Sequence, residues 1–212
     1  MSRTVGIIGM GVLGRQLLQM LVETHGAVTA VYFDDLLVGA NAPDAVPFGD
    51  HGKPEYASLD FYVGLGYQHL ATKQRLIAEL QRAGRRLPAF VHASAYIDRN
   101  AIIGDAVVLF PRCTIGSGVS IAAGALLHCA ATLAHDIAIG PSSYIGPGVT
   151  ISGDVAIGAR SFLGTGTAVA NGVGIGDDAI VGIGTCVTRD VASGASVIGN
   201  PMRVLGAPLV LR

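Results

Sequence analysis

The chain has 212 residues, half of them hydrophobic, and a formal net charge of −1 at pH 7. That balance offers no basic surface of the kind that phosphate-backbone binding needs, so nucleic acid is not expected as a partner. The three cysteines lie far apart without CxxC spacing, which argues against a disulfide framework or a zinc knuckle and favours a reducing cytoplasm.

Export and membrane insertion are also not expected. The first residues, "MSRTVGIIGMG", lack an apolar signal core with a small-residue cleavage site. The uncharged run between Arg112 and Asp136 is long enough to span a bilayer, but glycine, serine and histidine interrupt it.

The first part of the chain alternates strand-like and helix-like segments. Strands are expected at 4–8, 27–33 and 59–66, helices at 12–26 and 70–84, and a proline-rich loop at 39–58. This order predicts a small parallel sheet in an α/β, Rossmann-like half domain over residues 1–88.

A glycine-rich turn joins the first strand to the first helix. Gly9, Gly11 and Gly14 form G-x-G-x-x-G, and Asp34 and Asp35 end the next strand, a layout that holds nucleotides. The half sheet leaves no room for a second mononucleotide unit, so a nicotinamide dehydrogenase is not expected.

From Val91 the sequence follows a period of six. Every sixth position from 91 to 187 is Val, Ile or Leu in all 17 cases, and a second column four residues later is mostly small. A coil of three short strands with tight bends explains this period, so residues i and i+18 should stack as parallel neighbours about 4.8 Å apart. The sequence predicts an all-β parallel β-helix of five to six coils over residues 89–212.

One corner of this prism carries an ionisable pair. His135 lies two residues after the interior Leu133, so its ring is expected to point outward, with Gly153 one coil above and Asn171 two coils above. His92, His128 and His135 lack the spacing of a three-histidine zinc site, and no metal is expected.

A period-six prism preceded by a short nucleotide-fold domain resembles the bacterial sugar acetyltransferases of the sialic acid O-acetyltransferase and UDP-amino-sugar N-acetyltransferase group. The motif that carries the resemblance is "AHDIAIG", followed by a glycine 18 residues after the histidine. The resemblance implies a left-handed hexapeptide-repeat coil and a homotrimer. It also implies that His135 is the general base, that Asp136 orients the ring of His135, and that the Gly153 N–H donates a hydrogen bond to the oxyanion.

The resemblance also implies contacts with acetyl-CoA, the acyl donor, in a groove between two prisms. They fall on Thr165 and Ile183, which stack, and on Tyr144, where many members carry a second histidine. An equally good interpretation is that Tyr144 packs against the next subunit and does not contact the cofactor.

The glycine-rich turn would hold the nucleotide part of a nucleotide-linked sugar. The positions that the resemblance assigns to this substrate are Gly11, Val12, Leu13, Asp34, Asp35 and Gly66. Leu13 stands where the family loop often has a histidine.

The predicted function is acetyl-CoA-dependent N-acetylation of an amine on a nucleotide-linked amino sugar, by direct attack on the thioester. Two alternatives stay open at this point: O-acetylation of a sialic acid-type or other sugar hydroxyl, and a binding scaffold without chemistry. The residues do not identify the sugar, the nucleotide or the acyl group.

Overall fold

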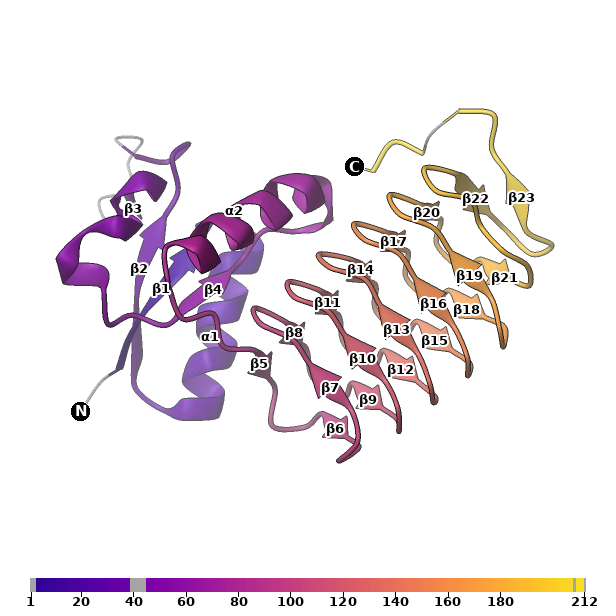
Figure 1. Ribbon diagram of the computed structural model, residues 1–212, viewed down its shortest axis with the longest axis horizontal. Coiled ribbons are helices and arrows are strands. Elements are labelled where there is room, and N and C mark those ends of the chain that lie inside the picture. Colours follow the sequence, from indigo (N-terminus) through magenta and orange to yellow (C-terminus); the bar gives the residue numbers. More distant parts are fainter. Residues whose placement is uncertain (1–2, 39–44, 208, 212) are drawn as a thin grey trace. The chain divides into compact units, whose positions relative to one another are not determined.

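A computed structural model describes residues 3–38, 45–207 and 209–211. The chain divides into two compact units, residues 1–90 and 91–212 (Figure 1). Within the described ranges, no helix combines the length and the apolar character that a membrane crossing needs.

The N-terminal unit is built on a parallel sheet of four strands in the order β3-β2-β1-β4. The strands are β1 (Arg3–Ile8), β2 (Val28–Phe33), β3 (Ala45–Val46) and β4 (Phe61–Val63). Because β2 and β4 lie on opposite sides of β1, the strand order reverses between β1 and β4. In open parallel sheets ligands bind beyond the carboxyl ends of the strands at such a reversal.

Two amphipathic helices belong to this unit, α1 (Val12–His25) and α2 (Leu70–Arg82). Leu17, Met20 and Leu21 are buried on one face of α1, in the spacing that a helix packed on a sheet requires. Gly26, with a φ of 83°, ends α1 in a conformation that glycine adopts without strain. Both helices agree with the predicted segments.

The segment predicted as loop, 39–58, contains structure that the sequence did not reveal. Strand β3 pairs Ala45 with Tyr32 and Val46 with Phe33, and two short 3₁₀ turns follow at Phe48–Gly52 and Pro54–Tyr56. A two-residue strand is too short to show a period, which is why this element was missed. Residues 39–44 lie outside the described residues.

The C-terminal unit is a β-solenoid, as the period of six predicts, whose stacked coils are visible in Figure 1. Its strands form three sheets. The first sheet contains β5 (Phe90–Val91), β8 (Val108–Leu109), β11 (Leu126–Leu127), β14 (Tyr144–Ile145), β17 (Phe162–Leu163), β20 (Ile180–Val181), β22 (Ser196–Ile198) and β23 (Arg203–Val204). The second contains β6 (Tyr96–Ile97), β9 (Thr114–Ile115), β12 (Thr132–Leu133), β15 (Thr150–Ile151), β18 (Ala168–Val169) and β21 (Cys186–Val187). The third contains β7 (Ile102–Ile103), β10 (Ser120–Ile121), β13 (Ala138–Ile139), β16 (Ala156–Ile157) and β19 (Gly174–Ile175).

The coils stack in register. Leu133 pairs with Ile151 and Ile139 with Ile157, which confirms the predicted stacking of positions i and i+18. The aliphatic column fills the interior, where Ile115, Ile121 and Leu127 are at most 1% exposed. Burying such side chains contributes about 1.5–3 kcal/mol each.

The last coil is two residues shorter than the others. Val191 pairs with Ile175 and Val197 with Val181, so each partner here is position i+16 instead of i+18. The period of six predicts Val191 in the column of small residues. In the structure Val191 takes the interior aliphatic position, because the repeat changes frame by two residues here. β23 then pairs antiparallel with β22 and closes the first sheet.

Candidate functional site

The turn between β12 and β13 holds an exposed histidine and aspartate in contact. His135 Nδ1 and Asp136 Oδ2 are 3.0 Å apart, and the two side chains are 55% and 65% exposed. The outward direction predicted for His135 is confirmed. If Nδ1 carries the proton and donates it to the carboxylate, Nε2 presents its lone pair to a ligand, which is the state a general base requires.

Gly153 lies in the next coil against the face of the imidazole. A Cβ atom at this position would come within 2.5 Å of His135 Nε2 and 2.9 Å of Nδ1, so the ring occupies the space that a side chain would need. The amides on either side are engaged: Ser152 N–H donates to Val169 O and Asp154 N–H to His135 O. For the Gly153 amide no acceptor is found among the described residues.

A third ionisable residue joins this corner, and the sequence reading missed it. The donor atoms of His135, Asp136 and Asp154 all lie within 4.8 Å of one another. The signal was present in the repeat, since Asp154 is the i+18 position of Asp136 and must therefore stack on it. All three side chains are exposed, and we assign no metal to them.

The residues predicted to contact acetyl-CoA lie at a different corner of the same prism. Tyr144 is on β14 of the first sheet, and Thr165 and Ile183 follow β17 and β20, on the side where the chain turns toward the second sheet. His135 lies where the chain turns from the second sheet to the third. A single chain therefore does not bring the two groups together.

The two corners also differ in character. Ile183 is 69% exposed and Thr165 below it is also exposed, so an apolar and a polar side chain follow each other along the axis. Tyr144 is half-buried and stacks on Phe162, with ring centroids 5.5 Å apart and an interplanar angle of 15°. Its ring is thus held by packing within its own chain, and both interpretations of this residue, cofactor contact and subunit contact, stay predictions.

His128 is a structural rather than a reactive histidine. Its ring stacks on Phe110 at 4.2 Å, and its Nδ1 accepts the Cys129 N–H at 2.8 Å. Burial lowers the pKa of His128, which favours the neutral ring.

Burial likewise raises the pKa of Cys113 to about 12, so this thiol is unreactive at neutral pH.

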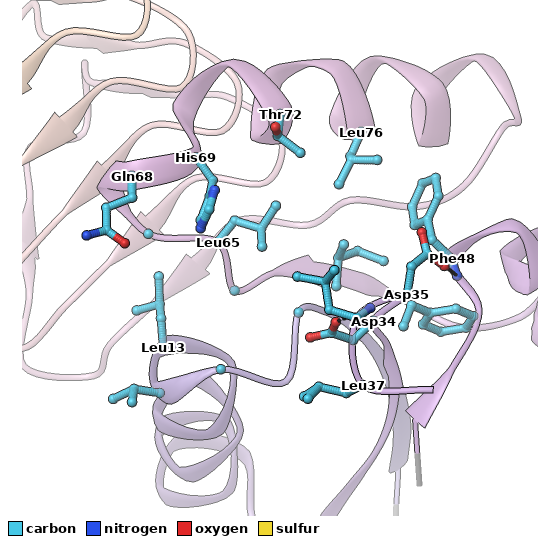
Figure 2. Close-up of a pocket in the computed structure, with 18 of the residues that line it drawn as sticks. Leu13, Asp34, Asp35, Leu37, Phe48, Leu65, Gln68, His69, Thr72 and Leu76 are labelled. Atoms are coloured by element: carbon cyan, nitrogen blue, oxygen red, sulfur yellow. Dashed lines mark hydrogen bonds between the residues drawn. The ribbon is translucent and has the colours of Figure 1, made fainter. Parts of the chain in front are cut away.

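The N-terminal unit contains a cavity of about 730 Å³ at the carboxyl ends of its strands (Figure 2). All six positions predicted to bind the nucleotide sugar line it: Gly11, Val12, Leu13, Asp34, Asp35 and Gly66. Figure 2 shows Phe48 and Asp35 at one end of the cavity, Leu13, Gln68 and His69 at the other, and Thr72 and Leu76 reaching in from α2.

The two aspartates of this cavity also hold its walls. Asp34 accepts the Met10 N–H at 2.8 Å and the Leu36 N–H at 3.1 Å, and Asp35 accepts the Phe48 N–H at 2.7 Å. Each carboxylate oxygen can accept more than one hydrogen bond, so both aspartates retain capacity for a ligand. They fix the glycine-rich turn and Phe48 in place around the cavity.

Close backbone packing explains the glycines of the turn. A Cβ atom on Gly14 would overlap the carbonyl oxygen of Gly9, and one on Gly64 would come within 2.9 Å of Gly14 N. Gly9 has a φ of 90°, a conformation that glycine adopts without strain. The first turn of α1 carries no acidic side chain, and no side chain caps it at Gly11. Among the described residues no side chain accepts the N–H groups of this first turn, and Gly11, Val12 and Leu13 line the cavity, so these groups can bind an anion there.

Comparisons with known proteins agree with this architecture. PerB from Caulobacter crescentus, solved in complex with CoA and GDP-perosamine, superposes with a TM-score of 0.86 at 28% identity, covering 96% of this chain and 97% of that one. The acetyltransferase domain of PglB from Neisseria gonorrhoeae, in complex with acetyl coenzyme A, gives a TM-score of 0.80 at 24% identity over 97% and 100% of the chains.

WeeI from Acinetobacter baumannii gives a TM-score of 0.69 at 20% identity over 97% of this chain and 100% of its own. No protein-family model and no curated protein sequence matches the chain. The three structures align with nearly the whole length of this chain. They confirm the resemblance indicated by the sequence: in fold, this chain is similar to a perosamine N-acetyltransferase and to the acetyltransferase domain of PglB.

Proposed function

We propose that the protein transfers the acetyl group of acetyl-CoA to an amine of a nucleotide-linked amino sugar. The likeness to PerB, with CoA and GDP-perosamine bound, supports an enzyme with this donor and this class of acceptor. The observation that carries the proposal is the exposed His135, paired with Asp136 and faced by the bare backbone of Gly153.

In this proposal His135 is the general base. The acceptor, which reaches the site as an ammonium ion, first loses one proton to solvent. Its nitrogen then forms a bond to the thioester carbonyl carbon while Nε2 of His135 takes a second proton from it. The C–S bond breaks, and the imidazolium returns that proton to the departing sulfur. A well-placed base contributes typically 10²- to 10⁴-fold.

Asp136 and Gly153 serve the same step. The carboxylate of Asp136 holds the Nδ1 proton, which fixes the ring and stabilises the imidazolium when it forms. The Gly153 N–H donates to the oxygen that becomes negative as the carbonyl carbon is attacked. One such donor contributes about 10²- to 10³-fold.

The cavity of the N-terminal unit suits the nucleotide part of the acceptor. Phe48, Leu37 and Leu76 offer apolar surface to a base, and the N-terminus of α1 offers N–H groups to phosphates. The ligand would then lie with its base toward Phe48 and its sugar beyond Leu13. This use of the sheet corresponds to a Rossmann-like half domain.

A homotrimer of left-handed coils would complete the reacting centre. Tyr144, Thr165 and Ile183 lie at one corner of the prism and His135 at another, so a second copy must bring its cofactor-binding corner to the histidine. The exposed column of Thr165 and Ile183 fits an extended donor lying along the axis. Acetyl-CoA supplies the activated acyl group in this groove.

His135→Ala tests the base. It should lower kcat by at least a hundredfold while the thermal shift caused by acetyl-CoA is kept. His25→Ala, which removes an exposed histidine of the N-terminal unit, is the matched control. Full activity of His135→Ala would rule out the assigned base, and turnover of free sugars alone would favour O-acetylation. Absence of any acetyl-CoA stabilisation in the unmodified protein would favour a scaffold without chemistry.

A further inference from the structure

Two carboxylates of like charge are stacked beside the proposed base. Thr132 pairs with Thr150 and Leu133 with Ile151, so the turns that follow these strands superimpose and Asp154 lies directly over Asp136. The Asp154 N–H donates to His135 O at 3.1 Å, which holds the second aspartate close to the histidine. Within the described ranges, no lysine or arginine lies at ion-pair distance from either carboxylate.

Another corner of the prism shows how the chain treats charges at the same separation. Arg160 and Asp178 are likewise stacked one coil apart, and they form a two-fold hydrogen-bonded ion pair with distances of 2.6 and 2.7 Å. Opposite charges stabilise such a stack, whereas like charges destabilise it. The carboxylates of Asp136 and Asp154 repel each other in the same arrangement, and a cation placed beside them relieves that repulsion.

Backbone geometry does not require the aspartates. Asp136 and Asp154 have φ values of 53° and 59°, in the left-handed region. Gly118 and Gly172, in the same column one coil below and one coil above, have φ values of 71° and 72°. Glycine meets the conformational requirement at this corner without any charge.

Resting on the proposed function, we propose that Asp154 is a specificity-determining residue that selects an amine over a hydroxyl acceptor. A primary amine is protonated at neutral pH and reaches the site as a cation, whereas a hydroxyl is neutral. Asp154, together with Asp136, attracts the ammonium form to the edge of the imidazole. After one proton is lost to solvent, the amine is left within reach of Nε2.

The test compares the unmodified protein with Asp154→Asn. Asparagine keeps the size of the side chain and tolerates the left-handed conformation, so the coil should fold unchanged. Asp154→Gly, which repeats the glycine found at positions 118 and 172 of the same column, is a second variant that removes the charge without strain. Asp177→Asn, at another corner of the prism, removes the same charge as a control.

GDP-perosamine and its counterpart with a hydroxyl in place of the amino group serve as acceptors. Thiol release gives KM and kcat for the amine, and the hydroxyl compound is measured as an acceptor or as a competitive inhibitor. Both Asp154 variants should raise KM for the amine about tenfold, with a smaller change in kcat and none in affinity for the hydroxyl compound. Asp177→Asn should change none of these values.

Three results would overturn the inference. An unchanged KM for the amine would show that Asp154 does not meet the acceptor. Equal losses with amine and hydroxyl compounds would assign Asp154 a purely structural role. Absence of transfer by the unmodified protein to every member of a panel of GDP- and UDP-linked amino sugars that includes GDP-perosamine would reject the proposed function itself and this inference with it, a result distinct from the first two.

Discussion

Replacing Gly153 with alanine should displace the imidazole of His135 without disturbing the coil. The new Cβ would lie 2.5 Å from Nε2, and such atoms rest at about 3.5 Å, so the ring must move by about 1 Å. The ring can do so because its side chain is 55% exposed and ends in solvent. The φ of Gly153 is not in the left-handed region, so alanine fits the backbone.

A displacement of this size at a reacting group can cost about a hundredfold in rate, equivalent to about 2.7 kcal/mol of activation free energy. We therefore expect Gly153→Ala to lower kcat/KM for acetyl transfer about a hundredfold and to leave Tm within about 2 °C. Steady-state thiol release and a thermal melt measure the two quantities.

Gly174→Ala is the matched control for this variant. Its Cβ would find no atom nearer than 3.6 Å, so it should keep full activity. Normal turnover of Gly153→Ala would refute the assigned geometry, because the imidazole could then not be the group that the new methyl displaces. A large fall in Tm would refute the assumption that only the side chain moves.

Other predictions concern the N-terminal unit. Burial lowers the pKa of Lys73 to about 7, so the folded state binds fewer protons than the unfolded chain between about pH 7 and 10.5, and stability should rise with pH across that window. Lys73→Met should accordingly raise the free energy of unfolding by a few kcal/mol at pH 7, and this increase should vanish near pH 10.5. Urea unfolding at several pH values measures it, and an increase that does not depend on pH would contradict the reasoning. Asp60→Asn should cost about 1–2 kcal/mol, because the buried carboxylate pairs with both Arg3 and Arg86, and an unchanged Tm would count against that role. Asp34→Ala should weaken GDP or UDP binding at least tenfold in calorimetry, since two amides of the cavity wall lose their acceptor, and equal affinity for both proteins would remove Asp34 from the site.

The solenoid was readable from the sequence because its period is set by interior packing. Each coil repeats the same three bends, so one aliphatic position in six determines which residues stack and which point outward. The outward direction of His135 and its contact with Gly153 followed from the six-residue period and the 18-residue coil alone. The same period places Asp154 one coil above Asp136, although the sequence motif itself contains only the neighbouring His135 and Asp136.

What the sequence reading missed depends on contacts that have no period. Strand β3 has two residues and exists through its pairing with β2. The change of frame before Val191 is visible only when its partner Ile175 is known. The hydrogen bonds that tie Asp34 and Asp35 to the cavity walls likewise arise from loops that come together in three dimensions.

Because the coils stack in register, equivalent positions in successive coils are separated by a fixed distance along the axis. A side chain relocated by one full turn of the solenoid keeps its direction and shifts along the axis by one strand spacing, about 4.8 Å. The distance between a reacting corner and a bound ligand can therefore be altered in fixed steps, by relocating two side chains rather than by reshaping the backbone. Such a prism offers evolution, or an engineer, a discrete set of reaches for acceptors of different length.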